Sequence, residues 1–198
     1  MNHYRRPVVG AAILAWMALG AGVVQAQESP VQAELPVLLT SCGQSPGPER
    51  VKFFLGRLDM EYEYLDQATA QHLIDGSFKS IIIVTGASLK GMGAAGVSME
   101  DELERTATLI AEAKHQGIMI ISAHVEGMSR RAQGAAAGDN SDEQSIDAVM
   151  PESQLMIVRE DGNEDRRFSI ISDNLGIPLV LFEKNMQLGE VLESVFNQ

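Results

Sequence analysis

The sequence contains a single cysteine, Cys42, so no disulfide can form within the chain. Aromatic residues make up only 5% of it, and the core must therefore be mainly aliphatic. Positive charge is also scarce, because residues 27–198 hold 13 of the 15 Lys and Arg residues and all 27 Asp and Glu residues. The resulting formal net charge of −14 repels nucleic acid and anionic lipid, and we expect neither as a partner.

Several signatures of nucleotide and metal sites are missing as well. Segment 40–47 has neither the Gly-Lys-Ser/Thr ending of a phosphate loop nor a Gly-x-Gly-x-x-Gly dinucleotide fingerprint. His72, His115 and His124 lack the short spacings at which histidines and methionines share a metal ion. We therefore predict no metal site and no cofactor, and we interpret the methionines as core residues.

The N-terminus has the layout of an export signal. Arg5 and Arg6 precede Val8–Val24, which is uncharged and mainly apolar. Small residues then occupy the positions that a signal peptidase reads, which predicts cleavage after Ala26 and a periplasmic or secreted protein without a membrane anchor. An uncleaved anchor is the alternative, because the apolar segment reaches the lower length limit of a membrane span. Residues 27–36 are interpreted as a flexible leader.

From residue 37 onward, strand-like and helix-like segments alternate, as in α/β domains. Strands are predicted at residues 37–40, 62–64, 81–84, 118–121, 155–158 and 177–182. Helices are predicted at residues 49–58, 68–74, 98–116, 141–150, 168–175 and 188–196. We therefore predict one domain at 37–198, with a doubly wound, mainly parallel α/β sheet of five or six strands. Helices on both faces would give a Rossmann- or flavodoxin-like three-layer arrangement.

Three predicted strands end in loops rich in Gly, hydroxyl and charged residues, at 41–47, 85–91 and 122–127. The carboxyl ends of parallel strands share one edge of a sheet, and ligands bind there. The pattern therefore predicts a binding site at this edge. Segment 86–96 is longer than the usual strand-to-helix connection and rich in glycine, so we interpret it as a flexible lid carrying Lys90.

The residues at this edge suit a small anionic ligand. Backbone N–H groups of the first loop, together with Lys90 and two adjacent arginines, would supply positive charge. Hydroxyl, amide, thiol and imidazole groups would supply directional hydrogen bonds. The candidate ligand-binding residues are Ser41, Cys42, Gln44, Ser45, Thr85, Ser88, Lys90, His124, Arg130 and Arg131. For the two arginines, the alternative is a surface ion pair with the acidic residues of segment 139–143.

Several of these motifs also carry a family resemblance. The residues concerned are Thr40–Ser45, Thr85–Gly91, His124 with Gly127, Arg130 and Arg131, Ser141 with Asp142, and Gly176–Leu179. On these residues, Leu38–Phe196 resembles a family of small exported bacterial α/β domains of unknown function. The Gly/Ala-rich segment 134–138 departs from the spacing of that family. The resemblance implies one exported α/β domain whose loops lie together, and it brings no known activity.

Two other functions remain open from the residues alone. Cys42 as nucleophile with His124 as base would make the protein a hydrolase or transferase, although no third residue is evident to orient the base. The protein would otherwise be an interaction module for another envelope protein, without a small ligand. Ligand identity, strand order and oligomeric state are not specified by these patterns.

Overall fold

The structure is a computed structural model that describes residues 1, 31–131 and 139–196. The predicted signal peptide, apart from Met1, and its cleavage site lie outside the described residues. So does segment 134–138, where the sequence departs from the family pattern. Within the described ranges, no helix combines the length and the apolar character needed to cross a membrane.

Six parallel strands form one sheet, which confirms the predicted fold class. The strands are β1 (Val37–Cys42), β2 (Tyr62–Tyr64), β3 (Ser80–Thr85), β4 (Met119–His124), β5 (Leu155–Arg159) and β6 (Leu179–Phe182). Their order across the sheet is β2-β1-β3-β4-β5-β6. The chain therefore reverses its winding direction between β1 and β3, and this is the switch point at which doubly wound sheets open a crevice for ligands.

Seven α-helices and three short 3₁₀ helices connect the strands within the described residues. The α-helices are α1 (Gly47–Arg57), α2 (Ala70–Asp75), α3 (Leu89–Ala95), α4 (Met99–Gln116), α5 (Ser141–Val149), α6 (Arg167–Leu175) and α7 (Gln187–Phe196). The 3₁₀ helices are η1 (Gly127–Arg130), η3 (Met150–Glu152) and η4 (Glu160–Asn163). Helix α4 begins at a capping box, in which the Ser98 hydroxyl and the Asp101 carboxylate each accept the other residue's backbone N–H, and it ends at Gly117 with φ +71°.

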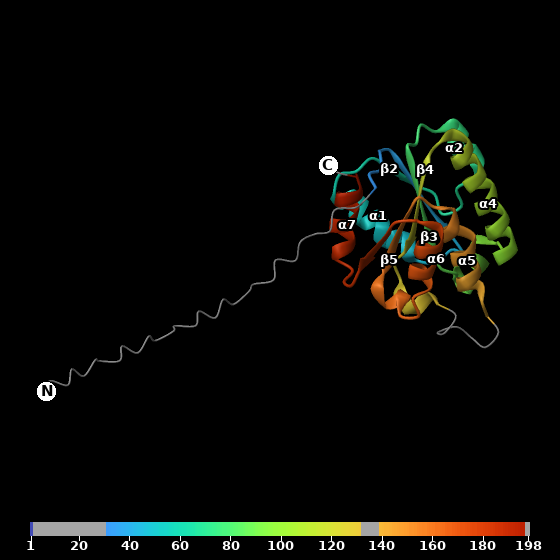
Figure 1. Ribbon diagram of the computed structural model, residues 1–198. Helices are drawn as coiled ribbons and strands as arrows, with labels where there is room; N and C mark the ends of the chain where they lie inside the picture. Colours follow the sequence, from blue (N-terminus) through green and yellow to red (C-terminus); the bar gives the residue numbers. More distant parts are fainter. Residues whose placement is uncertain (2–30, 132–138, 197–198) are drawn as a thin grey trace.

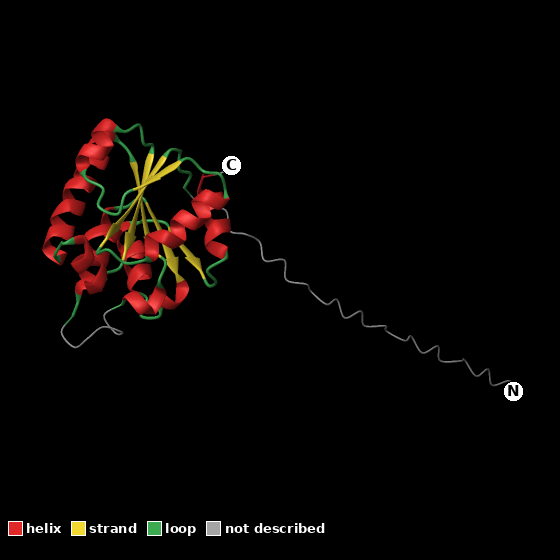
Figure 2. Ribbon diagram, turned by 180° about the vertical axis from the view of Figure 1, so that it is seen from behind, coloured by secondary structure: helices red, strands yellow, loops and turns green. Residues whose placement is uncertain are grey.

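The helices cover both faces of the sheet (Figure 1), and the central strands β1 and β3 are buried along their whole length. Helices α1 and α7 pack on one face against alternate residues of the central strands, such as Leu39 and Ile82. Helices α2 and α4 cover the other face, against Leu38 and Ile81, and α5 and α6 continue this layer over β5. Figure 2 shows the strands fanning between the two helical layers. Aliphatic residues dominate these clusters, in line with the low aromatic content.

Two local expectations differ from the structure. Segment 86–96, predicted to be a flexible lid, contains helix α3, which begins where the Ser88 hydroxyl accepts the N–H of Gly91. Residues 31–36, which belong to the segment interpreted as a flexible leader, pack on the domain. The N–H of Ala33 donates to the carbonyl of Val195, and the Ser80 hydroxyl donates to the carbonyl of Glu34. Tertiary partners far along the chain order both segments, and local sequence does not reveal such partners.

Candidate functional site

The loops after β1 and β3 meet at the switch point and close on each other. The N–H of Ser88 donates to the carbonyl of Gly43 at 2.7 Å, and Gln44 and Ala87 form an antiparallel bridge. Gly43 has φ +101°, and a Cβ there would lie 2.7 Å from the carbonyl oxygen of Gly86. The close approach of the two backbones therefore requires glycine. The crevice usual at this point is filled by the protein's own backbone.

Three backbone N–H groups at this edge, two of them in the first loop that the sequence suggests as an anion cradle, already bind carboxylates of the protein. The N–H of Gly43 donates to Glu102 at 2.8 Å, that of Gly47 to Glu126 at 3.1 Å, and that of Ala87 to Asp142 at 2.7 Å. All three carboxylate residues are buried. The protein thus supplies its own anions, and these groups are not free to bind an exogenous one.

Glu102 and Arg105 of α4 hold the first loop in place. Arg105 donates to the carboxylate of Glu102 through Nε at 3.0 Å and through Nη2 at 2.9 Å. Arg105 also donates to the carbonyls of Ser41 and Ala68, and Gln44 donates to Glu102. The ion pair is almost fully buried. Each charge is therefore stabilised by its partner and by these hydrogen bonds instead of by water.

His124, at the end of β4, is a buried structural residue. Its Nε2 lies 3.0 Å from the carbonyl oxygen of Gly127, which can only accept, so Nε2 carries the proton. Its Nδ1 lies 3.0 Å from the Thr85 hydroxyl, which then donates to it. Burial, opposed by the Gly127 hydrogen bond and aided by the nearby Arg131 charge, lowers the pKa of His124 to about 4. Since both nitrogens are engaged and the ring is neutral at pH 7, no nitrogen is free to act as a base.

Cys42 is fully buried on the same face of the sheet. In the strand register Cys42 lies opposite Thr85, and the Thr85 side chain in turn contacts His124. Two strand spacings, about 10 Å, therefore separate Cys42 from His124. Burial raises the pKa of the Cys42 thiol, which keeps it protonated. The structure does not bring the two residues together as a nucleophile and its base.

Most of the other candidate residues serve the fold. Arg131 is 2% exposed and binds the carboxylates of Glu143 and Asp165; the alternative of an ion pair with segment 139–143 thus anticipated Glu143, but as a surface contact and without Asp165. Ser41 donates to the carbonyl of Asp66, and Ser45 accepts the N–H of Gly47. Each of these polar groups has a hydrogen-bond partner inside the protein.

The remaining three candidates, Ser88, Lys90 and Arg130, line one recess. Its volume is about 300 Å³, and its other lining residues are Ala87, Leu89, Ser129, Asp139 and Asp142. The structure therefore brings together three of the ten predicted residues. Two carboxylates face the same recess, which the expectation of a purely anionic ligand did not include.

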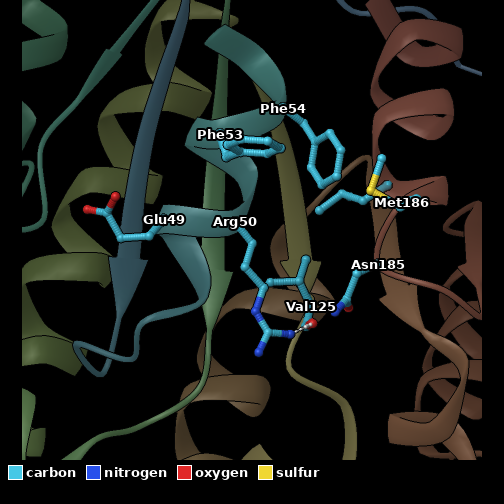
Figure 3. Close-up of a pocket in the computed structure, with 8 residues that line it drawn as sticks. Glu49, Arg50, Phe53, Phe54, Val125, Asn185 and Met186 are labelled. Atoms are coloured by element: carbon cyan, nitrogen blue, oxygen red, sulfur yellow. Dashed lines mark hydrogen bonds between the residues drawn. The ribbon is translucent and has the colours of Figure 1, made fainter. Parts of the chain in front are cut away.

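A second and more apolar groove lies between α1 and α7, beside the end of β4. Its volume is about 400 Å³, and it is lined by Glu49, Arg50, Phe53, Phe54, Val125, Asn185, Met186 and Leu188. Phe53 and Met186 are 58% and 59% exposed, so both present apolar surface at this groove. Figure 3 shows the Arg50 guanidinium below the two phenyl rings, while Glu49 points away from it.

Arg50 has an unusual partner for a half-buried arginine. It donates to the carbonyl of Val125 at 3.0 Å (Figure 3), and no carboxylate lies within ion-pair distance of it among the described residues. Of the eight described arginines, only Arg50 and Arg57 have no such ion pair, and Arg57 is exposed. The guanidinium of Arg50 therefore retains free N–H donors at the groove.

Sequence reasoning missed this groove. One signal was present: Phe53 stands three residues after Arg50 and off the apolar face that Val51, Phe54 and Leu55 form on α1. A single exposed aromatic residue is normal on a protein surface, and only its place beside Met186 and Arg50 in the folded protein marks a groove. The facing residues of the 183–188 segment carry no comparable pattern, because they reach α1 only through the tertiary fold.

Cofactor and metal binding have little support in the described part of the chain. Gly91–Gly96 has the spacing Gly-x-Gly-x-x-Gly, but these glycines lie inside α3 and at its C-terminal cap, not in a strand-to-helix turn. A Cβ at Gly91 would lie 2.1 Å from the carbonyl oxygen of Gln44, so this glycine permits close packing of α3 on the first loop. No group of three His, Cys, Asp or Glu side chains there could hold a metal ion.

Comparison with known proteins identifies a family but no activity. Residues 34–196 match the model of the family described as "Domain of unknown function (DUF6305)", and no curated protein matches the chain. The solved structure of the psychrotrophic esterase EstA from Pseudoalteromonas sp. is similar over 80% of this chain and 92% of that one, with 8% identity and a TM-score of 0.34. AlinE4, an SGNH-hydrolase family esterase, is similar over 75% and 77%, with 13% identity and a TM-score of 0.31. Similarity this low carries no argument about catalysis.

Proposed function

The chain belongs to the family of the domain of unknown function DUF6305, which supplies no activity. From the groove between α1 and α7, we propose that the protein binds a small organic anion with an apolar body. The ligand lies between α1 and α7, with its charged group on Arg50. The proposal retains a small anionic ligand at the carboxyl edge of the sheet, as expected from the sequence. The residues that bind it differ from the ten candidates of the sequence analysis.

The observation that carries the proposal is the half-buried guanidinium of Arg50, which has no carboxylate partner among the described residues. The described domain is strongly acidic and its other half-buried or buried arginines are all paired, so an unpaired one at a groove is informative. A carboxylate held by two guanidinium N–H groups is the usual partner of such a residue.

The walls of the groove define the rest of the ligand. Phe53, Phe54, Val125, Met186 and Leu188 present aromatic and aliphatic surface, and methionine adapts to ligands of differing shape. A volume of about 400 Å³ suits a compact molecule such as an aromatic or short aliphatic carboxylate. The surrounding negative charge disfavours polyanions, and so a singly charged ligand fits better than a phosphate ester.

A binding role agrees better with these residues than the hydrolase alternative. His124 has both ring nitrogens in hydrogen bonds and Cys42 is a buried, protonated thiol. Neither residue lines the groove. The proposed ligand is therefore bound and released unchanged.

The test is titration of the protein with octanoate and phenylacetate, and with the uncharged octanol and phenylacetamide, followed by calorimetry. The carboxylates are expected to bind and the neutral analogues to bind far less. Arg50→Ala should weaken carboxylate binding about 10- to 100-fold, since a hydrogen bond to a charged group contributes about 1.5–3 kcal/mol. Arg57→Ala is the matched control, because Arg57 lies on the same helix, is exposed and forms no ion pair with a described residue.

Equal binding of acid and neutral analogue, or equal affinities of Arg50→Ala and the unaltered protein, would contradict the proposal. Absence of any binding at millimolar concentration would also refute it and favour the interaction-module alternative. Phe53→Ala provides a second test on the apolar side, because loss of an exposed ring should reduce the affinity for both carboxylates without unfolding the protein.

We further propose that the protein acts outside the cytoplasm, after cleavage behind Ala26. The support is the order of Arg5, Arg6 and the apolar segment Val8–Val24 in the sequence. The N-terminal mass of the protein, recovered from the periplasm or medium of a bacterial host, is the test. A mature chain that begins at Gln27 is expected, and an intact chain retained in the membrane would contradict this.

A further inference from the structure

A polar recess lies between the β3 loop and η1. We propose that this recess binds a small zwitterion, a molecule with both an ammonium and a carboxylate group. Lys90 and Arg130 would bind the carboxylate, and Asp139 and Asp142 the ammonium group. The recess differs from the Arg50 groove in every lining residue, so the inference does not rest on the proposed function.

The positive side of the recess has donors to spare. Lys90 is exposed and forms no ion pair with any described residue. Arg130 donates through Nη1 to the carbonyl of Ala87 at 2.9 Å, and through Nε to Glu126 at 3.4 Å. Its Nη2 has no hydrogen bond to a described residue, so a ligand carboxylate can bind both cations there.

The negative side has matching acceptors. Asp142 accepts the N–H of Ala87 through Oδ1, and Asp139 accepts from the N–H and hydroxyl of Ser141 through Oδ1. Each residue keeps its Oδ2 free of hydrogen bonds to described residues. Burial, opposed by the Ala87 hydrogen bond and the Arg130 charge, raises the pKa of Asp142, and the charge of Asp139 adds to the rise. An ammonium group between the two carboxylates would relieve this repulsion.

The balance of charges selects the ligand class. Two cations and two carboxylates line a recess of about 300 Å³, with Ser88 and Ser129 between them. A simple anion is repelled by the aspartates, and a simple cation by Lys90 and Arg130. A zwitterion satisfies both sides at once, which is how a site of balanced charge gains selectivity.

The experiment uses glycine, β-alanine and 4-aminobutyrate, which differ in the separation of their ammonium and carboxylate groups. Acetate and methylamine represent each half alone. Binding is measured by calorimetry and by amide chemical shifts of residues 87–91. At least one zwitterion should bind at least tenfold more tightly than either half. Lys90→Ala should reduce that affinity about tenfold or more, whereas Lys79→Ala, which alters an exposed lysine without an ion pair before β3, should leave it unchanged.

Three outcomes would overturn the inference. Acetate or methylamine binding as tightly as the best zwitterion would indicate a simple ion site. Equal zwitterion affinity in Lys90→Ala and the unaltered protein would show that the zwitterion does not bind in this recess. Absence of zwitterion binding at millimolar concentration would refute the site itself. The Arg50→Ala variant should retain zwitterion binding, so that failure here and failure of the carboxylate site are distinguishable.

Discussion

Replacing Glu102 tests the idea that internal carboxylates organise the carboxyl edge. Its side chain is 1% exposed and accepts four hydrogen bonds, from the N–H of Gly43, from Gln44 and from two nitrogens of Arg105. Glu102→Ala leaves these donors, including a nearly buried guanidinium, without their acceptor. Breaking a buried ion pair in this way costs about 3–5 kcal/mol of unfolding free energy.

Urea denaturation at pH 7 is the assay. With an m-value of about 2 kcal/mol/M, the expected loss lowers the urea midpoint by about 1.5–2.5 M. Glu104→Ala is the control, because Glu104 is exposed two residues further along α4 and forms no ion pair with a described residue. It should change the unfolding free energy by no more than about 0.5 kcal/mol. Glu102→Gln should fall between the two, since its amide oxygen still accepts a hydrogen bond.

The double variant with Arg105→Ala provides the sharper comparison. If Glu102 and Arg105 act as one unit, the double variant loses much less than the sum of the single losses. Strictly additive losses would refute the coupling. A loss below about 1 kcal/mol for Glu102→Ala alone would refute the assigned role of the buried carboxylate.

Three other perturbations have defined outcomes. The pKa of His124, about 4 when folded, lies below its ordinary value near 6.5, so the unfolded chain binds the proton first and stability falls as the pH drops from 6.5 toward 4. The loss reaches about 3 kcal/mol, and His124→Gln should flatten that part of a pH series of urea midpoints; an unchanged slope would contradict the assignment. Gly43→Ala, at φ +101°, should destabilise the protein by about 1–3 kcal/mol in the same assay, whereas Gly93→Ala, with open space around it, should not; equal effects would contradict the close approach of the loops. Cys42 should resist a thiol reagent in the native protein and react fully in denaturant; rapid native reaction would show that the thiol is accessible.

Elements with a complete local signal were predictable from the sequence. Helix α4 has a capping box at Ser98, apolar residues at helical spacing and Gly117 in a left-handed cap, and β3 contains the unbroken apolar run 81–84. Helix α3 was not predictable, because its glycines favour a loop and its packing on the first loop is long-range. The apolar spacing of a helix or strand and the capping residues of a helix lie within a short stretch of sequence. Sequence patterns therefore reveal such elements.

The sequence by itself determined one α/β domain and the edge of its sheet where polar loops gather. Only the tertiary structure decided what those polar residues do. Arg130 and Arg131 are adjacent in sequence, yet one reaches a recess while the other is buried between Glu143 and Asp165. The N–H of Gly43 finds its acceptor 59 residues away, at Glu102. Buried polar groups need partners, and the choice among distant partners is made when the layers pack. That packing leaves the Arg50 guanidinium at the groove without a carboxylate partner among the described residues.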